Sequence, residues 1–134
     1  MNSAKRPKSK RAKLPVASEQ MKAWSSALAG EIAEWPQVST RSFFGFAALY
    51  RKDKMFGALP RTRAMQTPNS LVFKLPDSTS PIMARLEADS RIGSLQMQKA
   101  RWFTFELSSD ADLHDALDWL GRSYEAAGKR KKSS

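Results

Sequence analysis

Hydrophobic positions recur at helical spacing near both ends of the central segment. The first helix is expected to begin after Ser18, a favourable N-cap residue, and to end before Pro36. Its apolar face contains Met21, Trp24, Leu28 and Ile32. The last helix follows Ser109 and Asp112, which resemble a capping box, and it stops at Gly128. Its apolar stripe contains Leu113, Ala116, Leu117, Leu120 and Tyr124. Two amphipathic helices are therefore predicted to flank the central segment.

Between these helices the pattern changes to the two-residue period of β-strands. Residues 38–59 alternate in this way, and the polar run 51–54 divides them, which predicts a hairpin. Residues 71–75 form another predicted strand, which stops at Pro76. Residues 102–107 are rich in aromatic residues and predict a further strand.

A short helix is expected over residues 80–89, where Pro81 suits the first helical turn. Residues 60–69 predict an irregular loop, and residues 90–99 show no clear pattern. The predicted order is thus helix, three strands, helix, strand, helix. This order predicts the α+β class, with one compact domain over residues 16–128 and an antiparallel sheet whose N-terminal and C-terminal helices pack on one face.

The net charge of +10 lies in the two ends of the chain. Residues 1–15 and 129–134 have the composition of solvated, disordered arms. Ten of the 23 lysines and arginines lie in these arms, so the 13 in the body equal the 13 acidic residues. The basic residues of the arms are Lys5, Arg6, Lys8, Lys10, Arg11, Lys13, Lys129, Arg130, Lys131 and Lys132. Such arms bind DNA or RNA phosphates without reading sequence, or they serve only to solubilise the protein, and both interpretations stay open.

Residues that carry catalysis or bind metals are scarce in this chain. There is no cysteine, the only histidine is His114, and none of the common nucleotide-binding, hydrolase or metalloprotease motifs is present. The aspartates near His114 are expected to cap and solvate the last helix. They are Asp110, Asp112, Asp115 and Asp118. We therefore expect no catalytic residue, metal or cofactor, and the lack of a signal peptide or membrane span predicts a cytoplasmic protein without a membrane partner.

Three arginines of the body support an alternative function. Arg61, Arg63 and Arg101 lie near turns or strand starts, and their guanidinium groups could converge on an anionic ligand in a binding or enzyme-like pocket. The charge balance of the body favours salt bridges for these residues instead. The aromatic residues are expected to be mostly core. If some are exposed on the sheet, that face would stack bases, contact a protein partner or form a homodimer.

Four sequence motifs resemble a known family. They are SFFGFAALYRKDKMFGAL, LVFKL, QKARWFTF and DALDWL. Together they resemble the N-terminal domain family of the competence regulator TfoX (Sxy) over residues 38–127, with Phe44 and Gly45 matching its Phe-Gly motif. Phe46 stands where that family commonly has a second glycine. The end of the chain is also similar to the small luciferase-like domain of uncharacterised bacterial proteins.

The resemblance implies a bacterial cytoplasmic α+β domain that acts in regulation, without enzymatic activity, through protein or nucleic-acid contacts. Combined with the basic arms, it predicts a small non-catalytic interaction domain that binds nucleic acid non-specifically.

Overall fold

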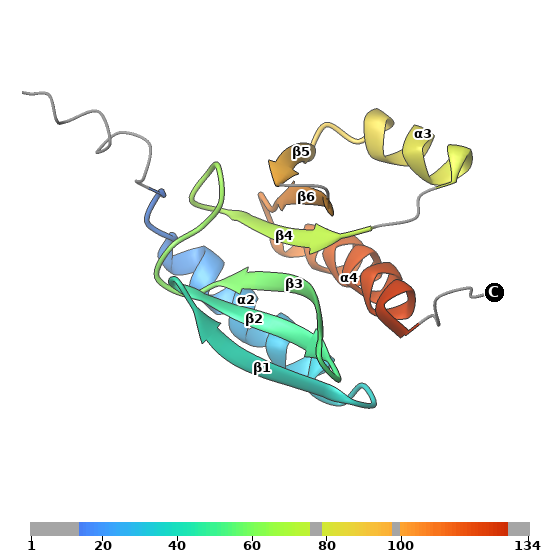
Figure 1. Ribbon diagram of the computed structural model, residues 1–134. Helices are drawn as coiled ribbons and strands as arrows, with labels where there is room; N and C mark the ends of the chain where they lie inside the picture. Colours follow the sequence, from blue (N-terminus) through green and yellow to red (C-terminus); the bar gives the residue numbers. More distant parts are fainter. Residues whose placement is uncertain (1–13, 76–78, 98–99, 129–134) are drawn as a thin grey trace, which may run out of the picture.

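The computed structural model describes residues 14–75, 79–97 and 100–128, and these form one compact α+β domain (Figure 1). In this part of the chain, six strands form one antiparallel sheet with the order β1-β2-β3-β4-β6-β5. The strands are β1 (Val38–Phe43), β2 (Phe46–Arg51), β3 (Lys54–Pro60), β4 (Ser70–Lys74), β5 (Ile92–Met97) and β6 (Ala100–Glu106). The helices are α2 (Glu19–Ile32), α3 (Ser80–Ala88), the short 3₁₀ helix η1 (Asp110–Asp112) and α4 (Leu113–Gly128). The predicted fold class is confirmed.

Two strands were not predicted from the sequence. Residues 38–51 are interrupted at Phe44 and Gly45, whose φ angles of 48° and 88° form a two-residue turn between β1 and β2. Strand β5 pairs with β6 over its whole length, although Gly93 and Ser94 interrupt its hydrophobic pattern. An added Cβ atom at Gly93 would lie 2.9 Å from the Thr104 hydroxyl oxygen, so a larger residue there would have to displace that side chain. Tertiary pairing, and not local alternation, therefore forms β5.

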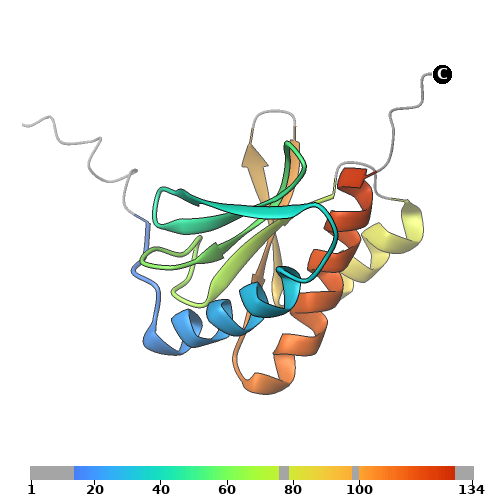
Figure 2. The ribbon, with the colours of Figure 1, turned by 90° about the horizontal axis from the view of Figure 1, so that it is seen from below.

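The two long helices pack on the same face of the sheet (Figure 2). Helix α2 is capped by the Ser18 hydroxyl, which accepts a hydrogen bond from the Met21 amide at 2.9 Å. Ser109 and Asp112 form the predicted capping box at the start of η1, which leads directly into α4. Helix α3 lies beside α4, where the Arg85 guanidinium lies 5.1 Å from the centre of the Trp119 ring.

The main core lies between this face and the helices. Phe73 of β4 stacks on Phe103 and on Trp119, with 5.6 Å between ring centres in each pair. At the other end of α4, the Tyr124 ring packs against Phe56 and its hydroxyl donates a hydrogen bond to the Pro36 carbonyl at 2.8 Å. These aromatic contacts fix α4 on the sheet, and α2 packs on the same face through its buried apolar residues. The described helices leave the second face of the sheet uncovered (Figure 2).

A second, smaller apolar cluster lies on that other face. It consists of Phe46, Ala58, Val72 and Trp102, with Leu14, Met55, Met65 and Leu95 packed around it. An antiparallel sheet with one solvated face usually alternates apolar and polar residues. Here both faces are apolar in the centre of the sheet, so the face without helices is the first place to look for a binding site.

Candidate binding groove on the open face of the sheet

A groove of about 660 Å³ lies on the face of the sheet that the described helices leave uncovered. Its lining is apolar except for one lysine, and consists of Leu14, Phe43, Phe44, Phe46, Met55, Ala58, Met65, Val72, Lys74 and Trp102. Ligand sites in proteins typically have volumes of about 300–1,000 Å³ and combine apolar walls with a few polar groups. The groove therefore has the size and the lining of a small-molecule site.

The register of the strands produces the hollow. Val72 of β4 lies opposite Ala58 of β3, which in turn lies opposite Ala48 of β2. Paired residues project from the same face of a sheet, so two alanines occupy the middle of this face. The larger side chains of Phe46 and Trp102 stand to either side. Small residues between large ones leave the depression.

One wall is the tip of the β1–β2 hairpin. Phe44 is 80% exposed and Phe43 is 43% exposed, and their rings meet edge to face with 4.8 Å between centres. The Gly45 carbonyl accepts hydrogen bonds from three consecutive amides, those of Arg61, Thr62 and Arg63. The tip is thereby fixed to the loop that follows β3, and these two phenylalanines are exposed exceptions to the expectation that the aromatic residues are mostly core.

The segment before α2 contributes Leu14 to the groove. Val16 forms an isolated antiparallel bridge with Arg63, and the Arg63 guanidinium donates a hydrogen bond to the Leu14 carbonyl at 2.9 Å. Ala17 and Ala64 add backbone hydrogen bonds between this segment and the loop after β3. Leu14 is therefore held in place by the Arg63 guanidinium and by the main-chain contacts of the residues that follow it.

Among the described residues, Lys74 is the only ionisable side chain that lines the groove. It pairs in register with Trp102, and its ammonium nitrogen lies 5.8 Å from the centre of that indole ring. No ion pair of Lys74 is found among the described residues, although Lys22, Arg91 and Arg122 each contact a carboxylate. The groove therefore presents one positive charge beside an apolar surface.

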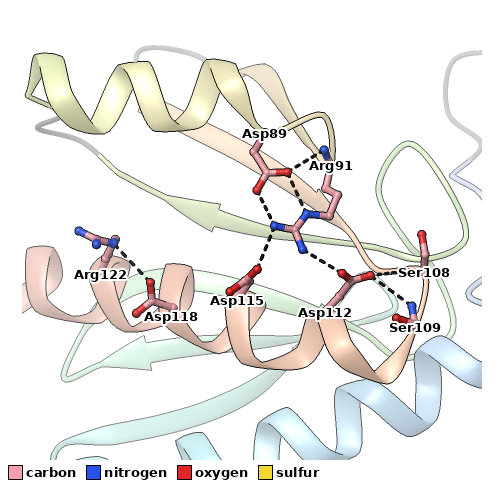
Figure 3. A network of polar contacts seen from close by, with 8 residues as sticks. All are labelled: Asp89, Arg91, Ser108, Ser109, Asp112, Asp115, Asp118 and Arg122. Carbon is pink, nitrogen blue, oxygen red and sulfur yellow. Dashed lines mark hydrogen bonds and ion pairs between the residues drawn. The ribbon is translucent and has the colours of Figure 1, made fainter.

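Among the described residues, the most extensive polar network lies outside the groove. It surrounds the start of β5, beside η1 and α4 (Figure 3). The Arg91 guanidinium contacts Asp89 at 2.7 Å, Asp112 at 2.9 Å and Asp115 at 3.0 Å. Its hydrogen bond to Asp89 holds the pKa of that carboxyl below the ordinary value of 3.8. The Ser108 amide, followed by Arg91, lowers the pKa of Asp112. Asp89, and then Asp115 and Asp112, raise the pKa of Arg91 further.

This network stabilises the fold, and each of its charged groups contacts a partner of opposite charge within the protein. One guanidinium is shared by three carboxylates that come from two parts of the chain. Asp110 accepts a hydrogen bond from the Trp24 indole at 2.8 Å, and Asp118 lies 3.8 Å from Arg122. The four aspartates near His114 thus cap the helix and bind neighbouring side chains. Arg91 was not singled out from the sequence, because Asp112 and Asp115 become its neighbours only in the fold.

The three arginines of the alternative pocket do not meet. Arg61 is exposed and lines a separate shallow depression beside α2, and Arg63 holds Leu14 as described above. Arg101 lies at the opposite end of the sheet, where its guanidinium approaches the Met83 sulfur at 3.9 Å. The ten basic residues of the arms lie outside the described residues. The structure therefore provides no shared guanidinium pocket in the part of the chain that it describes.

Comparisons with known proteins assign no family or function to this chain. No family model matches the chain, and neither curated proteins nor solved structures give a match. The resemblance to the TfoX N-terminal domain stays a prediction. Over residues 14–75, 79–97 and 100–128, no helix is long and apolar enough to cross a membrane, and no cluster of histidine and acidic residues fits a metal ion.

The groove could have been suspected from the sequence by one signal. In the predicted strands, the residues that project to one face of the sheet and those that project to the other are both apolar. Examples are Phe46 and Leu49 in one strand and Val72 and Phe73 in another. Helices at the two ends of a domain of this size are enough to cover one face. Apolar residues on the remaining face would be exposed to water, which is unfavourable. They therefore indicate that this face binds a ligand or a partner.

Proposed function

We propose that this protein is a non-catalytic binding domain that takes up an apolar ligand in the groove on the open face of its sheet. The observation that carries the proposal is the groove itself, which places about 660 Å³ of apolar-lined space on a face without a covering helix. Binding is favoured over catalysis because the part of the lining that the structure describes offers a single ionisable group, Lys74, without a second acid, base or nucleophile beside it.

The tip of the β1–β2 hairpin supports the same proposal independently. Phe44 combines a positive φ angle with 80% exposure, and both cost free energy for an aromatic residue. Asparagine or aspartate would suit this turn position better. Unfavourable local conformations of this kind concentrate at functional sites. Phe44 is unfavourable for stability at this position, and a role in contacting the ligand would explain why a phenylalanine is found there.

Nile red, an uncharged dye that fluoresces in apolar surroundings, tests the proposal directly. The full-length protein is expected to bind the dye, and Met65→Gln is expected to weaken binding several-fold because it places an amide in the groove wall. Met83→Gln is the matched control, since Met83 packs on the helix-covered side and does not line the groove. Absence of dye binding, or equal effects of the two substitutions, would contradict the proposal.

A second function is favoured by the separation of charge in the sequence. All of the net charge of +10 belongs to residues 1–13 and 129–132, while the body is neutral. We propose that these arms hold the domain on the phosphate backbone of DNA or RNA without base specificity. The resemblance to a family of non-enzymatic regulators supports this role. The ligand in the groove and the polyanion on the arms would then occupy different parts of the molecule.

A further inference from the structure

We infer that the ligand of the groove is an amphipathic monoanion, an alkyl or arylalkyl carboxylate whose carboxylate pairs with Lys74 and whose apolar part lies along the groove. This inference rests on the proposed function, because it names the class of ligand for the same site. It follows from the charge of the lining, the direction of the groove and the nature of its walls.

The charge of the lining selects an anion. Lys74 is the one charged group among ten lining residues, and the structure shows no carboxylate paired with it among the described residues. An ammonium beside an apolar surface is partly shielded from water, which strengthens its attraction to an anion. A carboxylate would accept a charge-assisted hydrogen bond from it. The Trp102 ring beneath the ammonium helps to keep the lysine side chain at the groove.

The direction of the groove selects an elongated ligand. Lys74 lies at the end of β4, two residues beyond Val72, which pairs with Ala58. Phe46 pairs with Pro60, which lies two residues from Ala58 in the opposite direction. The lysine and the aromatic wall are therefore about four residues apart along the strands, or about 13 Å. A carboxylate at Lys74 directs an extended apolar chain over Val72 and Ala58 toward Phe46 and the hairpin tip.

The walls of the groove favour this ligand over a macromolecule. A single-stranded nucleic acid carries a charge on every nucleotide and requires a series of cations along its path, whereas the lining formed by the described residues provides one. A second copy of the chain could insert its own Phe43 and Phe44, but this tip carries no acidic residue to pair with Lys74. A ligand with one negative charge and one apolar part satisfies both features of the groove.

Displacement of Nile red from the full-length protein tests the inference. Decanoate and decanol are the two competitors, because they share a chain length and differ in the charge of the head group. We expect decanoate to displace the dye about tenfold more effectively than decanol at about 0.15 M salt, the size of effect expected for one charge-assisted hydrogen bond. Decyltrimethylammonium is expected to be the weakest competitor of the three.

Substitution of Lys74 provides the decisive comparison. Lys74→Gln should reduce the advantage of decanoate over decanol to less than about twofold, and Lys74→Arg should restore most of it. Lys54→Gln removes the same charge from an exposed position of β3 that does not line the groove, and should leave the preference unchanged. Retained dye binding in each variant shows that the groove is intact.

The outcomes separate the inference from the proposed function. If wild-type protein binds Nile red but decanoate and decanol compete equally, the inference is overturned while the proposed function stands. A preference for decanoate that survives Lys74→Gln also overturns it, because the anion would then bind elsewhere, for example on the arms. Stronger displacement by an oligonucleotide, or a dimer in sedimentation that Phe44→Asn dissociates, would assign the groove to nucleic acid or to a second copy. Failure to bind Nile red at all would remove the proposed function itself.

Discussion

Phe44 is the residue at which stability and binding oppose each other. Its φ angle of 48° and its 80% exposure are unfavourable for phenylalanine, and asparagine accepts this conformation more readily. We expect Phe44→Asn to leave the free energy of unfolding unchanged or to raise it by about 0.5–1 kcal/mol, as relief of strain does. The same substitution should weaken Nile red binding. Urea unfolding and a dye titration on the same sample measure both effects.

The neighbouring glycine gives the opposite expectation. Gly45 has a φ angle of 88°, and an added Cβ atom would lie 2.8 Å from the Arg63 Cγ atom. Gly45→Ala should therefore lower the free energy of unfolding by about 1–3 kcal/mol. If Phe44→Asn destabilised the protein as much as Gly45→Ala does, the strain assigned to Phe44 would be wrong.

Arg91 is the residue whose loss should be most visible in the pH dependence of stability. We expect Arg91→Gln to lower the free energy of unfolding by about 1–3 kcal/mol at neutral pH, because three carboxylates lose their common partner. The lowered pKa values of Asp89 and Asp112 mean that this stabilisation is complete above about pH 5. It is lost as pH falls below 3.8 and through the lower pKa values of the folded protein. Thermal unfolding at a series of pH values measures the difference.

Arg122→Gln is the control for this measurement. Arg122 lies 3.8 Å from the single carboxylate Asp118, and both side chains are more than a third exposed. Such a surface pair contributes about 0–1 kcal/mol. A difference between wild type and Arg91→Gln that stays constant from pH 7 to about pH 2 would show that the aspartates are not the source of the stabilisation.

At the scale of elements, the contact between β3 and α4 fixes the distance between sheet and helix. Gly57 is buried beneath α4, and a Cβ atom there would lie 2.8 Å from the Leu120 Cδ2 atom and 3.1 Å from the Val72 carbonyl oxygen. We expect Gly57→Ala to lower the free energy of unfolding by about 1–3 kcal/mol. Gly30→Ala in α2 meets no atom within 4 Å and should raise it by about 0.5–1 kcal/mol. Chemical denaturation of both variants compares one substitution in two environments, and equal effects would contradict the packing described.

The elements that could be predicted from the sequence are those with local signals. Ser18 and the Ser109–Asp112 pair mark the helix starts, and the polar run 51–54 marks a turn. Strand β5 depends on pairing with β6, so its own residues gave no alternation. The turn at Phe44 was missed because phenylalanine is rarely found at positive φ.

The site was harder to predict than the elements, for a reason of topology. Lys74 belongs to an ordinary strand pattern, and only the sheet order places it beside Trp102. The same order carries Arg101 away from Arg61 and Arg63, because β6 begins at the end of the sheet opposite to the loop after β3. The spacing of residues along the chain predicted neither the contact of Lys74 with Trp102 nor the separation of the three arginines. Which face the helices would leave open also required the packed structure.

At the scale of the whole molecule, charge and apolar binding are assigned to separate parts. Replacement of the ten lysines and arginines of the arms by glutamine should abolish binding to a fluorescent DNA or RNA duplex, because the body is neutral. Full-length protein should bind with an affinity that falls steeply between about 50 and 200 mM salt. Fluorescence anisotropy over a salt series measures this dependence.

The arm variant also tests whether the two functions are independent. We expect its affinity for Nile red, an uncharged dye, to equal that of the wild type, because the groove lining found among the described residues is apolar apart from Lys74. Duplex binding that survives replacement of the arms would instead assign the polyanion site to the body.

The most direct test of the central claim is the indole region of a ¹H–¹⁵N spectrum of the full-length protein during titration with decanoate. Trp102 is the only one of the four tryptophans that lines the groove, while Trp24, Trp35 and Trp119 pack on the helix-covered side. The account predicts that the Trp102 signal, assigned by its loss in Trp102→Phe, moves progressively and reaches saturation while the other three stay in place. An unchanged Trp102 signal, or shifts confined to the other tryptophans, would contradict it.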